Sequence, residues 1–315
     1  MGKTVSESTV QAFVVMKNEV LKFVHSKRMA LYLGLVLLIL AIMTFAPYII
    51  GDGLPDTPGG ISSMYLSLVS LIVLMSSTLF ASISIVSEYE ERTALIVFTR
   101  PIRKISIYVG KVLASLLVSW AFIILYYAVT AVVSSVVAGG IDPDLLTSLV
   151  LAFGYSFGTT GVALLVSSIM KKSNTSTILT FVILLAILPA ISTVMTVSGT
   201  DASFMLDQAG GTIASASESY RDSMNAALDG LAAALSNPAN FINPDALMAA
   251  LAGTGMSPEQ FIAILSSPGV WFASSMDVSS MYMQAPDVAY SLGVMLAWGI
   301  ACMVIALIKF NRREF

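Results

Sequence analysis

The chain has 315 residues, of which 57% are hydrophobic and 11% charged, and its formal net charge is −3. Soluble domains carry charge on about 25% of their residues, so this composition excludes an ordinary soluble protein and predicts an integral membrane protein. The single cysteine, Cys302, excludes an intrachain disulfide.

Residues 1–28 are predicted to form an amphipathic helix that lies on the membrane surface, on its cytoplasmic side. Apolar side chains recur near one face of this helix, and polar ones lie mostly on the other. The apolar set is Val10, Phe13, Val14, Val20, Leu21 and Val24. A helix that is simply solvated is the alternative.

Six uncharged apolar runs follow, and each exceeds the roughly 20 residues that an α-helix needs to cross a bilayer. They are residues 29–50, 61–86, 112–138, 145–170, 175–198 and 288–308. Three of the connectors within residues 29–198 are short and turn-rich, namely residues 51–60, 139–144 and 171–174, and their lengths favour antiparallel neighbours. The sequence therefore predicts an all-α membrane protein with six transmembrane helices, in which Pro47 and Pro189 kink the first and fifth.

The distribution of basic residues predicts the orientation of these helices. With a cytoplasmic N-terminus, 15 of the 16 Lys and Arg residues lie in cytoplasmic segments, and Arg221 alone lies outside. Cytoplasmic loops collect Lys and Arg, so we expect both ends of the chain in the cytoplasm. The basic tail after the sixth helix, within residues 288–315, fits this orientation.

Residues 199–287, between the fifth and sixth helices, are predicted to form a small helical insert outside the cytoplasm. Apolar residues at helical spacing from Ile213 to Leu235 predict one long amphipathic helix. Cap residues before Pro244 and Pro258 predict the starts of two short helices. The seven methionines of this segment are expected to fill its apolar core rather than to bind a soft metal.

The most charged connector is the segment 87–111, which we call the docking loop. Its charged residues are Glu88, Glu90, Glu91, Arg92, Arg100, Arg103, Lys104 and Lys111. Ser87 and Glu90 have capping-box spacing, which predicts the start of a helix, and Pro101 is expected to end it. A second short amphipathic piece is expected to end at Gly110 and Lys111. A folded, charged element at the membrane surface indicates a docking surface for a soluble partner.

The docking loop also resembles the signature of ABC type-2 transporter permeases. The matching residues are Glu88, Glu91, Thr93, Pro101, Arg103, Gly110 and Lys111. One departure is Arg92, which stands where the family usually has a glycine before the threonine. The remaining likeness is coarse: an N-terminal amphipathic helix, six spans and a basic tail.

The resemblance implies a permease subunit that works with a separate ABC ATP-binding subunit, commonly as two permeases with two ATPases. ATP and Mg²⁺ would then bind in the partner subunit, and this chain would bind no cofactor or metal. Export across the cell membrane is the implied activity. The residues assigned to partner docking are Glu88, Glu91, Arg92, Thr93, Pro101, Arg103, Lys104 and Lys111. Membrane lipid, a second permease copy and the ATPase are the expected partners, and no nucleic acid is expected.

The motif Gly154-Tyr155-Ser156-Phe157-Gly158 matches the nucleophile elbow of hydrolases. It lies inside a predicted span, and the chain's one histidine, His25, lies in the cytoplasmic segment. We therefore expect Gly154, Gly158 and Gly161 to pack helices together, and no catalytic serine.

None of the six apolar runs holds an acid, a lysine or a histidine. Ion-coupled carriers usually place such a residue inside the bundle, so the transport path is expected to be apolar or lined by hydroxyls and glycines. The energy must then come from elsewhere. A secondary carrier or channel, a membrane-embedded enzyme and a regulatory membrane protein without an ATPase partner are the alternatives.

Overall fold

The computed structural model describes residues 2–51, 53–90, 103–236 and 283–312, which form helices and contain no strand. Six helical segments in this part of the chain are long and apolar enough to cross a membrane. They are Lys27–Ile49, Pro58–Glu90, Lys104–Val137, Leu145–Ile169, Ser173–Thr196 and Val288–Arg312. The prediction of an all-α membrane protein with six spans is confirmed.

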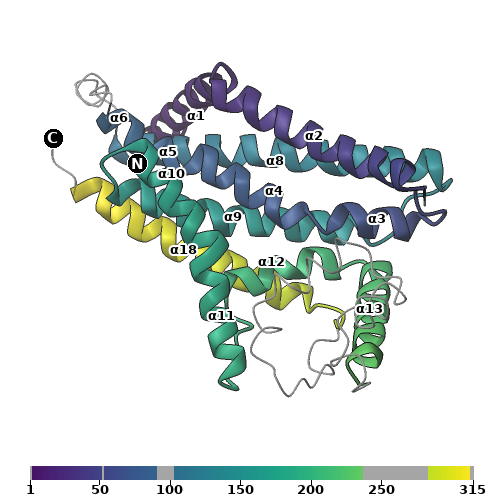
Figure 1. Ribbon diagram of the computed structural model, residues 1–315. Coiled ribbons are helices and arrows are strands. Elements are labelled where there is room, and N and C mark those ends of the chain that lie inside the picture. The colour runs from purple at the N-terminus through teal and green to yellow at the C-terminus, as the bar shows by residue number, and fades with distance from the viewer. Residues whose placement is uncertain (1, 52, 91–102, 237–282, 313–315) are drawn as a thin grey trace.

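Helix α9 (Leu145–Ile169) lies at the centre of the bundle, packed against α8 (Lys104–Val137) and α18 (Val288–Arg312). The first span, α2 (Lys27–Ile50), follows α1 (Gly2–Val24) after a turn at His25 and Ser26, and both helices pack against α8. Figure 1 shows α1 and the end of α18 at the left-hand end of the bundle. The two ends of the described chain therefore lie on the same side.

An aromatic cluster joins α1 and α2 to the bundle. The Tyr32 ring contacts Phe80 at 5.7 Å and Phe122 at 4.5 Å between ring centroids, and Phe23 of α1 contacts Phe80 at 5.5 Å. All three contacts are edge-to-face, an arrangement that aromatic quadrupoles favour. These buried rings fix the position of α1 relative to the spans.

The second span is a broken helix rather than a continuous one. It consists of α3 (Pro58–Leu66), α4 (Val69–Ser76), the π-helix η1 (Ser77–Ala81), α5 (Ser82–Ser84) and α6 (Val86–Glu90). A helix begins here as the capping-box spacing predicts, but α6 starts at Val86, so Ser87 lies inside its first turn rather than at its cap. The end predicted at Pro101 lies outside the described residues.

The third span begins earlier than the apolar pattern predicts. Helix α8 starts at Lys104 and runs without a break to Val137. The separate amphipathic piece expected before Lys111 is therefore wrong: these residues form the first turns of α8. This extension carries Lys111 into the body of the bundle.

Proline has different consequences in the first and fifth spans. Helix α2 continues through Pro47 to Ile50. The fifth span is divided into α10 (Ser173–Val182), the π-helix η2 (Ile183–Ile187) and α11 (Leu188–Val197). Pro189 has no backbone N–H, so it cannot donate the hydrogen bond that would continue an α-helix from the preceding turn. The wider π-helical turn η2 lies directly before it.

In the described part of the segment 199–287, two helices stand where one long helix was predicted, α12 (Leu206–Ser215) and α13 (Glu218–Ser236). The chain turns at Ala216 and Ser217, and Ser217 Oγ donates to Asp142 Oδ2 at 2.9 Å. This bond fixes the turn to the connector between α8 and α9. The short helices expected after residues 244 and 258 lie outside the described residues.

Candidate functional site

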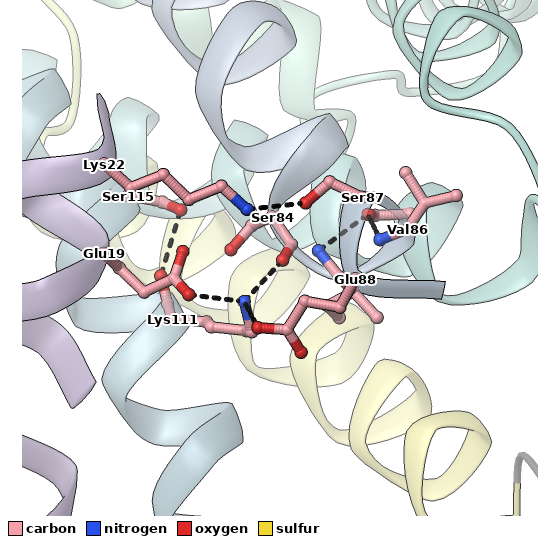
Figure 2. Close-up of polar contacts among 10 residues, drawn as sticks. Glu19, Lys22, Ser84, Val86, Ser87, Glu88, Lys111 and Ser115 are labelled. Atoms are coloured by element: carbon pink, nitrogen blue, oxygen red, sulfur yellow. Dashed lines mark hydrogen bonds and ion pairs between the residues drawn. The ribbon is translucent and has the colours of Figure 1, made fainter. Parts of the chain in front are cut away.

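Three charged side chains meet where α1, α6 and α8 come together. Figure 1 shows α1 and α6 at the left-hand end of the bundle. The Lys111 Nζ atom of α8 lies 2.8 Å from Glu19 Oε1 of α1 and 2.7 Å from Glu88 Oε1 of α6. It also donates a hydrogen bond to the Ser84 carbonyl oxygen at 2.7 Å. Figure 2 shows these contacts converging on the ammonium group. We call Glu19, Glu88 and Lys111 the ion cluster.

The ion cluster depends on a close approach between α1 and α8. A Cβ atom at Gly110 would lie 2.7 Å from Val15 Cβ and 2.8 Å from the Ala12 carbonyl oxygen, so only glycine fits there. Among residues 8–24 of α1, the buried ones are Ala12, Glu19 and Phe23. Their spacing places them on one face of the helix, and this face carries Glu19 onto Lys111.

Burial makes the ion cluster energetically important. The Lys111 side chain is fully buried, and those of Glu19 and Glu88 are 10% and 8% exposed. An ammonium group has three donors, and each has an oxygen partner here. Removing one partner from a buried ion pair costs about 3–5 kcal/mol, because the remaining charge stays out of water without compensation. The cluster therefore holds its three helices together.

Neighbouring hydrogen bonds fix the backbone around the cluster, as Figure 2 shows. Ser115 Oγ donates to the Lys111 carbonyl oxygen at 3.0 Å, one turn along α8. Lys22 Nζ donates to Ser87 Oγ at 3.4 Å, which adds a second contact between α1 and α6. Both contacts keep Glu88 and Lys111 in register.

The pair formed by Glu88 and Lys111 closes the base of the docking loop. Glu88 lies just before residues 91–102, and Lys111 lies just after them, in the second turn of α8. The 2.7 Å contact therefore connects the segment that leaves the bundle to the segment that returns. Through Glu19, the same contact connects both segments to α1.

The residues assigned to docking occupy different environments. Arg103 and Lys104 are exposed, as expected for a contact surface. Glu88 and Lys111 are only 6% and 0% exposed, so the expectation that Glu88 faces a partner across an exposed surface is corrected. Four of the assigned residues lie outside the described residues: Glu91, Arg92, Thr93 and Pro101.

Glu19 was not identified from the sequence, although it completes the ion cluster. The sequence feature that could have identified Glu19 is its position on the same helical face as Ala12 and Phe23. A carboxylate on a buried face needs a counter-charge, and the buried Lys111 of α8 supplies it.

The three glycines of α9 lie where neighbouring helices come close. A Cβ atom at Gly154 would lie 2.6 Å from Leu292 Cδ2, and one at Gly158 would lie 2.7 Å from Leu206 Cδ1. At Gly161 the obstacle is backbone, with the Gly299 carbonyl oxygen 2.7 Å away. Ser156 Oγ donates to Ser119 Oγ at 2.9 Å inside the bundle.

Within the described part of the chain, no group of three or more His, Cys, Asp or Glu side chains could hold a metal ion.

Comparison with known proteins identifies the family. Curated proteins give no match to the chain. A family model described as "ABC-2 family transporter protein" matches residues 13–315, from the second half of α1 to the C-terminal end of the sequence. This match includes all six spans and both ends of the docking loop, and it confirms the resemblance found in that loop: the chain belongs to the ABC-2 family of transporter membrane proteins.

Proposed function

We propose that this chain is the permease subunit of an ATP-driven exporter, and that a separate ATPase subunit docks on the loop 87–111. The observation that carries the proposal is the closed base of that loop. A segment held at both ends by a buried ion pair transmits force, whereas a free connector would absorb it. The family membership supports the assignment, since a permease of this kind is the membrane component of an ABC transporter and is not itself catalytic.

Charge supports the proposed side of docking. The exposed Arg103 and Lys104 flank the start of α8, and the exposed Lys171 and Lys309 lie near the start of α10 and the end of α18. Tyr108 contacts Phe310, and Glu90 bonds to Ser173, so these helix ends lie at one end of the bundle. Basic residues collect on the cytoplasmic side of membrane proteins, where an ATPase would find ATP and Mg²⁺. We accordingly propose that both chain ends lie in the cytoplasm and that the protein resides in the cell membrane.

The outward face of α1 supports contact with lipid. Opposite the face that packs on α8, five large apolar side chains are between 46% and 62% exposed: Val10, Phe13, Val14, Leu21 and Val24. Lys17 and Lys22 are exposed beside them. An apolar stripe with flanking lysines suits the boundary between acyl chains and anionic headgroups.

We further propose that two permease copies assemble with two ATPase subunits, as the family resemblance implies. The outer surfaces of α2 and α10–α11 are mostly exposed and apolar, so they are available to lipid or to a second copy. Crosslinking in native membranes would show whether lipid or a second permease copy covers these surfaces.

The experiment that tests the function is affinity purification of the chain from its own membranes in a mild detergent. We expect an ATP-hydrolysing subunit to co-purify, and we expect the chain purified alone to bind no ATP. Stoichiometric ATP binding by the chain alone would contradict the proposal that a separate subunit binds and hydrolyses ATP. A complex without any ATPase would favour a carrier, a channel or a regulatory protein instead.

A further inference from the structure

The backbone of the second span is irregular immediately before the docking loop. At η1 the Ser82 N–H donates to the Ser77 carbonyl oxygen, five residues back, so this turn is wider than an α-helical turn. Hydroxyls inside the span also donate to its own carbonyl groups: Thr78 Oγ1 donates to Leu74 O at 2.8 Å, and Ser82 Oγ donates to Thr78 O. Side chains that bond backward in this way bend helices.

Neighbouring helices supply partners for the backbone groups near this break. Ser167 Oγ of α9 accepts hydrogen bonds from the N–H groups of Ile85 and Val86, at 3.2 and 3.1 Å. Ser176 Oγ of α10 donates to the Ser82 carbonyl oxygen at 2.5 Å. Both serines are fully buried. The break is therefore a satisfied feature of the fold rather than a defect in it.

The two sides of α5–α6 are held by different kinds of contact. Towards α1 and α8 the contact is the ion cluster, whose charges cannot be separated inside the protein without a large penalty. Towards α9 and α10 the buried polar contacts are uncharged hydroxyls, including Ser82 Oγ against Thr177 Oγ1 at 3.1 Å. They lie beside an apolar cluster that Ile85 shares with Ala163 and Leu164 of α9. A hydroxyl has one rotatable donor and two acceptor lone pairs, so it can exchange partners without leaving a buried group unsatisfied.

One charged contact does cross to α10. Glu90 Oε2 accepts a hydrogen bond from the Ser173 N–H at 2.8 Å. Glu90 is exposed, so water can replace this bond when it opens.

From this asymmetry we propose that residues 82–90 are a lever that moves with α1 and the first turns of α8 against α9 and α10, with the π-helix η1 as its pivot. Ser167 and Ser176 are positioning residues that guide the lever, since they bond to its backbone and hold no charge. The lever carries the docking loop at its far end, so displacement of that loop reaches the centre of the bundle through η1. This inference deepens the proposed function and rests on it.

The test is to fix the lever to α10. Ser82→Cys with Thr177→Cys, in a Cys302→Ala background, places two sulfurs where hydroxyl oxygens lie 3.1 Å apart. Oxidation, or a short bifunctional thiol reagent, should crosslink them. We expect the crosslinked permease to retain the ATPase in a pull-down but to lose about tenfold or more of its transport-coupled ATP turnover, because a gating motion limits turnover. Reduction should restore the turnover.

The matched control is Ser76→Cys with Ser119→Cys, which joins two hydroxyl positions in contact on the bundle side of the pivot. This crosslink should leave turnover unchanged. Normal turnover with the 82–177 crosslink formed, or equal loss with the 76–119 crosslink, would overturn the lever. Failure of residues 82 and 177 to crosslink by either reagent would contradict the contact itself. Loss of the ATPase from the wild-type pull-down would instead contradict the proposed function.

Discussion

The Lys111 ammonium lies 2.7 Å from the Glu88 carboxylate, and these two residues stand on either side of the segment 91–102. The contact turns a connector between two spans into a closed loop with a rigid base. Glu19 extends that base to α1, which is distant in sequence from the loop.

Lys111→Met should lower the free energy of unfolding by about 3–5 kcal/mol, because it leaves two carboxylates buried without a counter-charge. Thermal unfolding in detergent measures this change. The triple variant Glu19→Leu, Glu88→Leu and Lys111→Met removes every charge of the cluster and should recover most of the loss. Lys171→Met, at an exposed lysine, is the control and should change stability by less than about 0.5 kcal/mol. Equal stability of Lys111→Met and Lys171→Met would disprove the role of the cluster.

Gly161→Ala tests the packing of α9 on α18. The added methyl group would lie 2.7 Å from the Gly299 carbonyl oxygen and 2.8 Å from Gly299 Cα, so the two helices must separate. We expect a loss of about 1–3 kcal/mol in unfolding free energy. Gly293→Ala, in α18, meets no atom within 4 Å and should be neutral or slightly stabilising. The prediction fails if the two variants unfold at the same temperature.

The pH dependence of stability should contain a contribution from Asp207. Burial raises the pKa of the Asp207 carboxyl, and a hydrogen bond from Ser192 Oγ at 2.6 Å offsets part of that rise. The folded state therefore holds this proton more tightly than the unfolded state. Its contribution to the free energy of unfolding is fully present below the ordinary pKa of 3.8 and is lost as the pH rises through the folded pKa.

Asp207→Asn keeps a hydrogen-bond acceptor for Ser192 and removes the titration. Wild type should thus gain stability relative to this variant as the pH falls from about 7 towards about 4. Asp201→Asn is the control with the opposite sign, because hydrogen bonds from the Ser203 N–H and Oγ lower the pKa of the exposed Asp201 carboxyl. If the unfolding temperatures of wild type and Asp207→Asn change in parallel with pH, the stabilising role of the raised Asp207 pKa is contradicted.

The six spans could be predicted because each is an uninterrupted apolar run longer than the bilayer requires. The ion cluster could not, because Glu19 and Lys111 are far apart in sequence and each reads as a solvated charge. Only the close approach of α1 at Gly110 buries them. The loop residues were identified by resemblance, but the resemblance does not distinguish the exposed Arg103 from the buried Glu88.

The break in the second span is marked in the sequence by a cluster of Ser and Thr residues, which hydrophobic periodicity does not detect. Ser76, Ser77, Thr78, Ser82 and Ser84 cluster within an otherwise apolar run. Hydrophobicity alone treats the run as one helix, because hydroxyls are tolerated in a span. Their partners on α9 and α10 depend on tertiary packing and could not be inferred from the run itself.

The proposed orientation can be tested with single cysteines in a Cys302→Ala background. Asp56→Cys and Thr200→Cys occupy exposed positions in outer connectors and should react with an impermeant thiol reagent added to intact cells. Arg103→Cys and Lys171→Cys, also exposed, should react only after the membrane is opened. Labelling of residue 103 in intact cells would reverse the orientation that places the docking loop in the cytoplasm.

The most direct measurement of the central claim is ATPase association and ATP turnover in a permease with reversed charge at the loop. Arg103→Glu with Lys104→Glu changes two exposed residues and leaves the ion cluster intact, whereas Glu88→Lys would disrupt the fold. Like charges opposed across a docking surface cost several kcal/mol, so we expect the pulled-down ATPase and the substrate-stimulated turnover to fall by about tenfold or more.

The amount of folded permease should stay the same, and Lys309→Glu with Arg312→Glu, which reverses two charges at the end of α18, should keep wild-type association. If Arg103→Glu with Lys104→Glu instead binds the ATPase and supports turnover at wild-type levels, the loop 87–111 is not the docking site.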